Sequence, residues 1–484
     1  MNRRHKGILG GHRRAGVLLH LTSLPRDDQN PGMQRSARRF VDFLQTAGLS
    51  VWQMLPIGPS HGGSPYDLAS AHAGDPSWVS DEPLPACLPA ALARQQGAER
   101  LEAAFAFCEE RGLPEEFEIF LAEQGGWLDD YALYQTLKER EGGRPWWEWP
   151  QSLRDHEEQA LAPVRASADF RRQRFWQWLF FYQWTDLRHY AGSKGVLLFG
   201  DMPFFAGHDS ADVWAHRELF RLDAHGHPEV VAGVPPDYFS ADGQRWGNPM
   251  YRWDVMEKQG FLWWRERLKT QLALFDLLRI DHFRGLEACW EIPVDAPTAA
   301  AGHWSKVPGQ ALLDSLERLW GHLPVVAEDL GVITDGVTQL RDRHGFAGMK
   351  VLQFAFGDDA RNPYLPHNHV RNAVVYTGTH DNDTTVGWFA GLSAEMKQRI
   401  HEYLGGQEPM PWALVRAAMA SVADLAVVPM QDLLALNSTQ RMNTPGSVRG
   451  NWAYRLAWGD MPGDLVGRLR HMVQIYGREA PVTD

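Results

Sequence analysis

Eight short apolar segments, separated by stretches with helical patterning, are the feature that most constrains the fold of this chain. They span residues 16–21, 50–55, 195–201, 277–283, 323–329, 349–356, 373–379 and 425–430. Each segment is apolar on both faces, which is typical of parallel strands covered by helices. Eight is the number of strands that closes a (β/α)8 barrel. We therefore expect an α/β protein built on a (β/α)8 TIM barrel.

The spacing of the eight segments is uneven, which predicts insertions in the barrel. Connections within a barrel are usually short. Residues 76–165 carry Pro and Gly breaks around helix-like stretches, which indicates an inserted, mainly helical subdomain. Residues 202–276 include GVPPDYFSADGQRWGNPMYRWD, which has no clear period and predicts a long structured loop in a second insertion. We expect residues 1–484 to form a single catalytic barrel with these insertions, and no β-rich domain after the helix predicted at 464–477.

Net charge and cysteine usage limit the partners and the compartment. The formal net charge is −12, which does not favour nucleic acid or an anionic membrane as a partner. No stretch reaches the roughly 18 apolar residues that a membrane span needs. The three cysteines, Cys87, Cys108 and Cys289, are too few and too scattered for a disulfide framework or a thiolate metal site. We expect a cytoplasmic protein.

Three carboxylates follow predicted strands and are the strongest sign of chemistry. Asp281 lies in LLRIDHFRG, Glu328 in LPVVAEDLG and Asp381 in VVYTGTHDND. The carboxyl ends of barrel strands form the rim where enzymes of this fold keep their active sites. Two carboxyl groups there can serve as nucleophile and general acid/base for glycosyl transfer, while a third holds the sugar. The alternative is that these acids only cap the loops that follow the strands.

The neighbours of the three acids suggest different roles. Arg279 and Asp281 point to the same side of their strand, so Arg279 should lower the pKa of Asp281 and keep a nucleophile ionised. Glu328 follows three apolar residues, 325–327, which should raise its pKa, as a proton donor requires. Asp381 follows His380 and is placed to hydrogen-bond sugar hydroxyls.

Other kinds of site have weaker support. Four acids and histidines cluster near the rim (His282, His380, Asp381 and Asp383), but no H-E-x-x-H or comparable metal-ligand spacing appears. The G-x-S-x-G elbow of serine hydrolases is absent, and GSPY at 63–66 does not match it. No phosphate-binding glycine loop follows a strand, which disfavours a nucleotide. We expect neither a metal nor a cofactor.

Several longer motifs resemble the amylomaltases, or 4-α-glucanotransferases, of glycoside hydrolase family 77 in the α-amylase superfamily. They run in unbroken order from residue 16 to 455 and include AGVLLHLTSLP, GDMPFFAGHDSADVWAH, RIDHFRGLEACWEIP, GMKVLQFAFG, YTGTHDNDTTVGW and RMNTPGSVRGNW. The resemblance implies a barrel without a C-terminal β domain. It also implies a retaining, cofactor-independent double displacement, with maltooligosaccharides and other α-1,4-glucans as donor and acceptor.

The same resemblance assigns roles to individual residues. The nucleophile matches Asp281, the acid/base matches Glu328 and the third carboxylate matches Asp381. The donor-sugar contacts match Tyr66, Asp201, Arg279 and His380. A loop that covers the cleft matches Asp237, Trp246 and Asn248, and the residue that faces this loop matches Asn451. Trp246 is the tryptophan that we expect to stack on sugar.

Two alternative functions remain. A hydrolase of the same superfamily would use the same acids with water as the acceptor, so only the resemblance separates it from a transferase. A catalytically silent glucan-binding protein would lack at least one rim acid, whereas this chain keeps all three together with Arg279 and His380. The sequence therefore favours a glucan-transferring enzyme.

Overall fold

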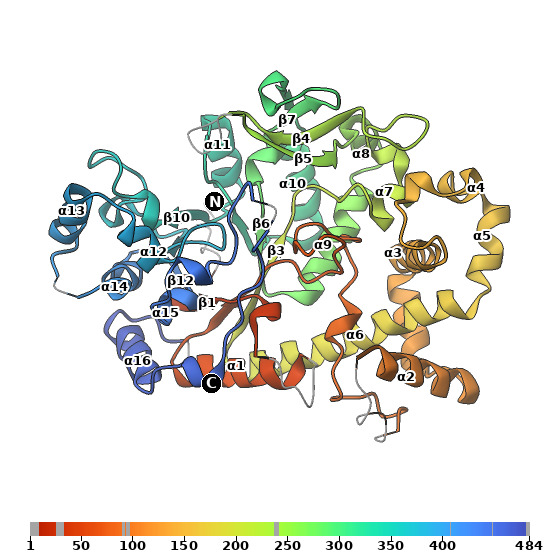
Figure 1. Cartoon of the computed structure of the whole chain (residues 1–484), viewed down its shortest axis with the longest axis horizontal. Helices are drawn as coiled ribbons and strands as arrows, with labels where there is room; N and C mark the ends of the chain where they lie inside the picture. The colour runs from red at the N-terminus through yellow and green to blue at the C-terminus, as the bar shows by residue number, and fades with distance from the viewer. Residues whose placement is uncertain are drawn as a thin grey trace.

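The eight predicted strands form a parallel barrel. The computed structural model describes residues 9–25, 33–89, 92, 97–236, 242–406, 408–447 and 449–480. Within these residues the barrel strands, in chain order, are β1 (Arg14–Leu18), β2 (Val51–Gln53), β3 (Leu197–Met202), β6 (Leu277–Ile280), β9 (Val325–Ala327), β10 (Gly348–Val351), β11 (Ala373–Tyr376) and β12 (Leu425–Pro429). Neighbouring strands pair in the order β10-β11-β12-β1-β2-β3-β6-β9 (Figure 1). The (β/α)8 prediction is confirmed.

The barrel closes between β9 and β10, the two ends of this pairing order, through a bridge. Val326 of β9 pairs in parallel with Ala347, next to β10, and the backbone N–H of Ala327 donates to the carbonyl of Ala347 at 2.8 Å. At one position β1 and β2 lie so close together that a side chain is excluded. A Cβ on Gly16 of β1 would lie 2.4 Å from the carbonyl oxygen of Val51, so this position needs glycine.

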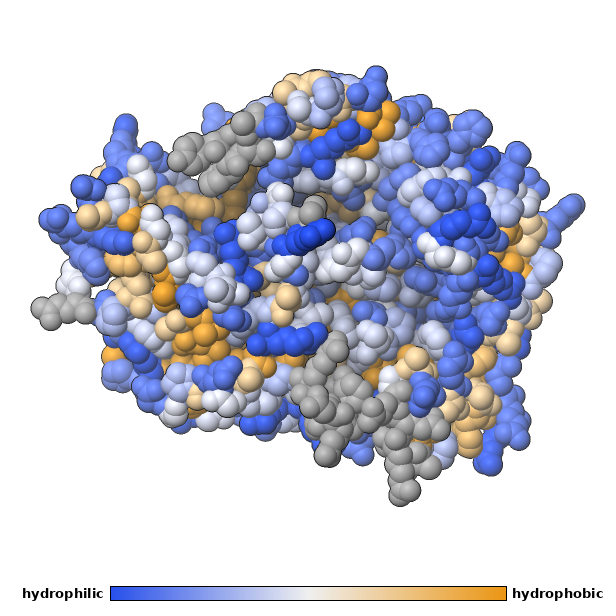
Figure 2. Space-filling view, viewed as in Figure 1, coloured by the Kyte–Doolittle hydropathy of each residue, from blue (hydrophilic) through white to orange (hydrophobic). Residues whose placement is uncertain are grey.

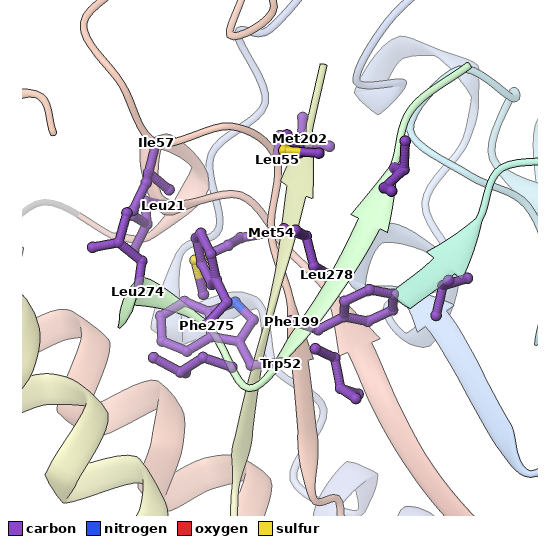
Figure 3. Close-up of a cluster of buried hydrophobic side chains, with 14 of the residues drawn as sticks. Leu21, Trp52, Met54, Leu55, Ile57, Phe199, Met202, Leu274, Phe275 and Leu278 are labelled. Carbon is purple, nitrogen blue, oxygen red and sulfur yellow. The ribbon is translucent and has the colours of Figure 1, made fainter. Parts of the chain in front are cut away.

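The core lies inside the barrel and between the barrel and its helices. Figure 3 shows part of it, where Trp52 of β2, Phe199 of β3 and Phe275 gather with aliphatic side chains. Trp52 is fully buried, and its indole N–H donates to the carbonyl of Leu19 at 2.8 Å. A buried tryptophan is stable in such a core because its one polar atom has a partner.

Helices surround the strands. On the barrel they are α1 (Gln34–Thr46), α6 (Ala168–Ser193), α9 (Leu262–Leu274), α10 (Gly309–Trp320), α11 (Asp335–Arg343), α14 (Trp412–Ala420), α15 (Met430–Leu433) and α16 (Leu465–Ile475). Short helices α7 (Ala211–Ala215), α8 (Trp253–Lys258), α12 (Thr385–Ala390) and α13 (Ala394–Leu404) lie in the longer connections. Within the described residues, no helix combines the length and apolar character that crossing a membrane requires. The face seen in Figure 2 is mostly hydrophilic, with its apolar side chains in separate patches.

The described part of residues 76–165 contains four α-helices: α2 (Gly97–Arg111), α3 (Glu115–Arg140), α4 (Gln151–Arg154) and α5 (Glu158–Arg165). They lie at the right of Figure 1, and α3 packs along α6. Trp178 and Trp184 of α6 are buried, in line with a role in the core rather than in binding. The division of the chain into a barrel and inserted subdomains remains our proposal.

A second, antiparallel sheet stands over the barrel, and the sequence analysis did not anticipate it. In the part of the chain that the structure describes, its order is β5-β4-β7-β8, from β4 (Val230–Val234), β5 (Gln244–Pro249), β7 (Ala288–Pro293) and β8 (His303–Lys306). Where the sequence predicts a long loop, β4 and β5 pair instead. The strand β5 is mostly exposed and contains Gly247 and Pro249, so it lacks the alternation that identifies a strand. In the same sheet, β4 also pairs with β7, which comes from a separate connection of the chain.

Candidate active site

The three candidate acids follow the carboxyl ends of three barrel strands. Asp281 directly follows β6, Glu328 directly follows β9, and Asp381 lies in the loop after β11. The first two are joined through the backbone, because the N–H of Glu328 donates to the carbonyl of Ile280 at 3.1 Å. Parallel strands that end at the same rim thus bring residues far apart in sequence into one site.

Arg279 organises the centre of the site. Its Nη1 donates to both carboxylate oxygens of Asp201 at 2.7 Å, and its Nη2 lies 2.9 Å from Oδ1 of Asp281. Both Arg279 and Asp201 are buried. One guanidinium therefore serves two carboxylates, and its position on β6 fixes the orientation of Asp281.

Burial raises the pKa of Asp281 to about 6, although Arg279 acts in the opposite direction. Arg279 lowers the pKa of Asp281, as predicted, but burial outweighs it, so the expectation of a pKa below the usual range is wrong. The reason is physical: removing water penalises the ionised form, and the charge of Arg279 is shared with Asp201, which itself raises the pKa of Asp281. The side chain of Asp281 is still 29% exposed, so one edge faces open space.

Glu328 is held by two backbone N–H groups. Its Oε2 accepts from the N–H of His282 at 2.8 Å and its Oε1 from that of Leu330 at 3.0 Å. His282 adopts a left-handed conformation with φ of 51°, unusual for a residue other than glycine, and this turn aims its N–H at Glu328. Burial raises the pKa of Glu328 to about 7, opposed by Arg279, and this is the direction predicted from the sequence.

Asp381 is held in the ionised form. Burial on its own would raise the pKa of Asp381, but His380, whose Nε2 lies 3.3 Å from Oδ2, and the amide of Asn443, which donates to Oδ1 at 2.6 Å, bring it well below its usual range. Arg441 also donates to the backbone carbonyl of Asp381 at 2.5 Å. Reciprocally, Asp381 outweighs burial and raises the pKa of His380.

The four predicted donor-sugar contacts meet in one cluster. The hydroxyl of Tyr66 donates to Oδ2 of Asp201 at 2.7 Å and lies 2.9 Å from Nε2 of His380. The rings of Tyr66 and His380 stack with their centroids 5.4 Å apart. Through Asp201 this cluster joins Arg279. The rings of Tyr66 and His380 therefore form an aromatic surface beside the buried ion pair of Asp201 and Arg279.

The residues predicted for the covering loop are less closely linked to the acids. Trp246 of β5 is 39% exposed and meets His282 edge-on, with ring centroids 4.9 Å apart. The amide of Asn248 donates to the carbonyl of Ala206 at 2.9 Å. Asp237 lies outside the described residues. The contacts of Asn451 are within its own loop: Oδ1 accepts from the N–H of Thr444 and Nδ2 donates to the carbonyl of Ser447, both at 2.9 Å.

Three residues of the site escaped the sequence analysis: Arg441, Asn443 and Trp452. Trp452 has φ of 62° and packs against Tyr66 and His380, with ring centroids 6.0 and 6.1 Å away. All three lie in RMNTPGSVRGNW, a loop with no periodicity, and reach a partner about sixty or more positions away. Their one signal is that this segment is among the motifs that carry the family resemblance.

One group of side chains among the described residues has spacing suitable for a metal, and it lies away from the three acids in the sequence. Asp314 and Glu317 belong to α10, and His344 follows α11. Nδ1 of His344 lies 3.1 Å from Oε2 of Glu317, and its Nε2 lies 2.9 Å from the amide nitrogen of Gln310. The imidazole therefore already has a neighbour at each nitrogen, as expected for a contact between two helices.

The arrangement separates two acids by their protonation. Burial raises the pKa of both acids, to about 6 for Asp281 and to about 7 for Glu328, so Glu328 is the acid that keeps its proton closer to neutral pH. A carboxylate that can attack and a carboxylic acid that can donate a proton are the two groups that cleavage of a glycosidic bond requires. The ionised Asp381 and the aromatic wall of Tyr66 and Trp452 are suited to holding a sugar beside them.

Comparison with known proteins agrees with this geometry. A model of the 4-alpha-glucanotransferase family matches residues 19–460. The 4-alpha-glucanotransferase of Thermus thermophilus is 48% identical over 95% of this chain and 98% of its own length, and that of Synechocystis is 43% identical over 97% and 99%. The solved amylomaltase of Streptococcus agalactiae in complex with acarbose is 35% identical, with a TM-score of 0.90 over 96% of this chain and 100% of that one. The chain therefore belongs to the 4-α-glucanotransferases of glycoside hydrolase family 77, enzymes that transfer segments of α-glucan.

Proposed function

We propose that this enzyme transfers a segment of an α-1,4-glucan to the 4-hydroxyl of another glucan or of glucose by a retaining double displacement. The observation that carries the proposal is the placement of Asp281 and Glu328 at the ends of paired strands, with Arg279 2.9 Å from Asp281 and with Glu328 buried so that its pKa is raised to about 7. This arrangement lets one acid attack while the other donates a proton.

The first displacement breaks the donor glucan. The carboxylate of Asp281 attacks the anomeric carbon of the sugar beside it, and Glu328 gives its proton to the leaving glycosidic oxygen. Arg279, 2.9 Å from Asp281, orients the nucleophile and keeps its attacking oxygen directed toward the open edge of the site. The product is a glycosyl ester on Asp281 and a shortened glucan with a new 4-hydroxyl.

The second displacement makes the new glucan. Glu328, now ionised, takes the proton from the 4-hydroxyl of an acceptor sugar, whose oxygen attacks the anomeric carbon and releases Asp281. Both acids return to their starting protonation states. Two inversions at one carbon retain the α configuration.

Asp381 and its neighbours hold the donor sugar in this proposal. An ionised carboxylate accepts hydrogen bonds from sugar hydroxyls more strongly when the ring gains positive charge in the transition state. His380 and Asn443 keep Asp381 ionised, and the rings of Tyr66 and Trp452 offer apolar faces beside it. Trp246, with Asn248 and Asp237, would contact glucan from the covering loop, and Asn451 would face that loop.

The substrates in this proposal are maltooligosaccharides and other α-1,4-glucans, as donor and as acceptor. A relative from Streptococcus agalactiae was solved with acarbose, which supports an oligosaccharide as the ligand of this cleft. The net charge of −12 supports our view that nucleic acid is not a partner. We propose the cytoplasm as the compartment, because the sequence offers only three cysteines and no disulfide framework.

The test uses maltotriose as the sole substrate and follows both the product ladder and the number of reducing ends. Transfer between glucans should give glucose and longer maltooligosaccharides while the number of reducing ends stays constant. Shorter products with a rising number of reducing ends would show water to be the acceptor and would overturn the proposal. An unchanged substrate with a folded protein would overturn it as well.

The pKa values of the two acids predict a narrow pH optimum. Activity requires Asp281 ionised and Glu328 protonated, so kcat/KM should rise with pH through about 6 and fall through about 7. In Glu328→Gln, the limb that falls above neutrality should disappear, because glutamine does not titrate. A wild-type profile that stays flat from pH 5 to 9 would contradict the assignment of both acids.

Replacement of Asn443 should weaken the stabilisation of the transition state. In Asn443→Ala, Asp381 loses the hydrogen bond at 2.6 Å that helps to keep it ionised. A hydrogen bond to a charged group contributes about 1.5–3 kcal/mol, so kcat should fall about 10- to 100-fold, with a smaller change in KM. Asn437→Ala is the matched control, because Asn437 is exposed and bonds only locally, to Thr439. An unchanged kcat in Asn443→Ala would rule out the role.

The role of Trp246 predicts a dependence on chain length. If Trp246 stacks on sugar away from the bond that is cleaved, Trp246→Ala should raise KM for amylose about 2- to 10-fold and leave maltotriose nearly unaffected. The control is Trp320→Ala on α10, since Trp320 has a similar exposure, 36% against 39%. Equal losses on both substrates would argue against stacking.

A further inference from the structure

The seam between β9 and β10 is the place where the strands of the barrel are least closely paired. In the described part of the chain, the other neighbouring strands pair along several residues, whereas these two share an isolated bridge between Val326 and Ala347. Glu328 follows β9 directly at this seam. The acid/base therefore needs support that the backbone pairing of its own strand supplies on one side only, from β6.

The side chain of Asp329 crosses the seam. Its Oδ1 accepts from the backbone N–H of Met349 on β10 at 2.7 Å, and its Oδ2 accepts from Nη1 of Arg341 on α11. Asp329 is 7% exposed, so these charge-assisted hydrogen bonds form largely away from water, where they are strong. One carboxylate thus joins the end of β9 to the next strand and to the helix that connects them.

The backbone of β10 leaves room for this ion pair at one glycine. A Cβ on Gly348 would lie 2.5 Å from Oδ2 of Asp329 and 2.8 Å from Nη1 of Arg341, so any side chain at this position would displace the pair. Asp329, Arg341 and Gly348 therefore form a fitted clamp across the seam.

Asp329 also belongs to the group of charges around Glu328. Burial raises the pKa of Glu328 to about 7, and the negative charges of Asp281 and Asp329 act in the same direction, whereas Arg279 opposes them. Beyond β10, Tyr364 interacts with both Glu328 and Asp329, but burial raises its pKa to about 12, so it stays neutral during the reaction. Asp329 is the carboxylate of this group that has no part in the proposed chemistry.

We propose that Asp329 is a positioning residue for the acid/base: it clamps the seam between β9 and β10, fixes the point from which Glu328 projects, and keeps a further negative charge beside that acid. Asp329 itself touches no substrate. Arg341 and Lys350 are the cations that interact with Asp329, and they compensate part of its charge. The inference rests on the proposed function, because it takes Glu328 as the proton donor.

Asp329→Asn tests the role of the charge. The amide oxygen of asparagine can still accept from the N–H of Met349, but its NH2 group cannot accept from Arg341, so thermal unfolding is measured in parallel. The limb of kcat/KM that falls above neutrality should move to lower pH by about half a pH unit, because a less negative environment favours ionised Glu328. A limb that stays at its wild-type position in the folded variant would overturn the proposal.

Arg341→Gln should move the same limb in the opposite direction. Loss of the cation leaves the charge of Asp329 less compensated, so Glu328 should keep its proton to higher pH. A clamp that only supported the fold would not give opposite movements. Movement of the limb to lower pH in both variants would therefore contradict the electrostatic role.

Asp329→Ala tests the mechanical part of the clamp, because it also removes the hydrogen bond to Met349. We expect kcat on maltotriose to fall about 10-fold or more with little change in KM, since the donor-sugar contacts on other strands are untouched. Asp342→Asn is the matched control: Asp342 binds the same Arg341, but its side chain is 59% exposed. Its kcat and its pH profile should match wild type, and an unchanged kcat in Asp329→Ala would overturn the positioning role.

Glu328→Gln separates this inference from the proposed function. If the limb above neutrality disappears in Glu328→Gln but stays in place in Asp329→Asn, only the positioning role of Asp329 is wrong. If the limb persists in Glu328→Gln, the assignment of the acid/base itself fails, and the role of Asp329 fails with it.

Discussion

Asp281→Asn should lower kcat on maltotriose by about 10⁴-fold or more while the protein remains folded. Asparagine has nearly the same shape as aspartate, but its amide cannot form the glycosyl ester, so the first displacement has no nucleophile. Removal of a residue that acts as nucleophile costs losses of this size in other enzymes with covalent intermediates. The measurement is the rate of glucose release, with thermal unfolding followed in parallel.

The interpretation of that loss depends on a matched change elsewhere. Asp254 on α8 is exposed and pairs with Arg252 at the surface, so Asp254→Asn should keep wild-type kcat. Asp281→Asn should also still bind maltooligosaccharides, because Tyr66, Asp381 and His380 are untouched. If Asp281→Asn retained more than about a tenth of wild-type kcat, Asp281 would not be the nucleophile.

Glu328→Gln should lower kcat on maltotriose by about 10²–10⁴-fold, the usual contribution of general acid–base catalysis. The amide oxygen of glutamine can still accept a hydrogen bond from the N–H of either His282 or Leu330, whereas its NH2 group cannot accept from the other, so thermal unfolding should be measured in parallel. The defect lies in proton donation to the leaving oxygen. A donor whose leaving group needs no proton, such as maltosyl fluoride, should therefore form the ester with this variant at a rate much closer to wild type, which a burst of released fluoride would measure.

This rescue distinguishes a proton donor from a residue that merely supports the fold. Glu287→Gln is the control, because Glu287 pairs with Lys306 and Arg284 near the same turn and has no part in the proposed chemistry. Glu287→Gln should react with both maltotriose and maltosyl fluoride at the wild-type rates. If the rate of Glu328→Gln fell to the same extent on maltosyl fluoride as on maltotriose, Glu328 would not be the general acid.

The barrel and its three acids could be predicted from the sequence because their signals are local. A strand covered by helices is a short apolar run, and an acid at its end lies at the rim whatever the rest of the chain does. Arg279 and Asp281 share a face because side chains alternate along β6. Such arguments need only a few consecutive residues.

The features that were missed depend on distant partners. β5 becomes a strand by pairing with β4 beside β7, although its own residues QRWGNP are exposed and carry Gly247. Asn443 acquires its role only where its loop reaches Asp381, 62 positions away.

The pKa of Asp281 shows a different limit of sequence-based reasoning. The sequence identifies its neighbour Arg279 but not the burial of the pair or the presence of Asp201 on the adjacent strand β3. Burial and Asp201 raise the pKa more than Arg279 lowers it. The sign of an electrostatic shift therefore requires the three-dimensional environment, even where the motif places the acid at the end of its strand correctly.

The central claim is that Asp281 carries the glucan between donor and acceptor, and trapping that ester tests it most directly. Glu328→Gln should form the ester from maltosyl fluoride but turn it over slowly, because no base activates the acceptor. The intact mass should then increase by one maltosyl group, and peptide sequencing should place the group on Asp281. A maltosyl group on Asp201 or Asp381, or rapid release of maltose without any covalent adduct, would contradict the account.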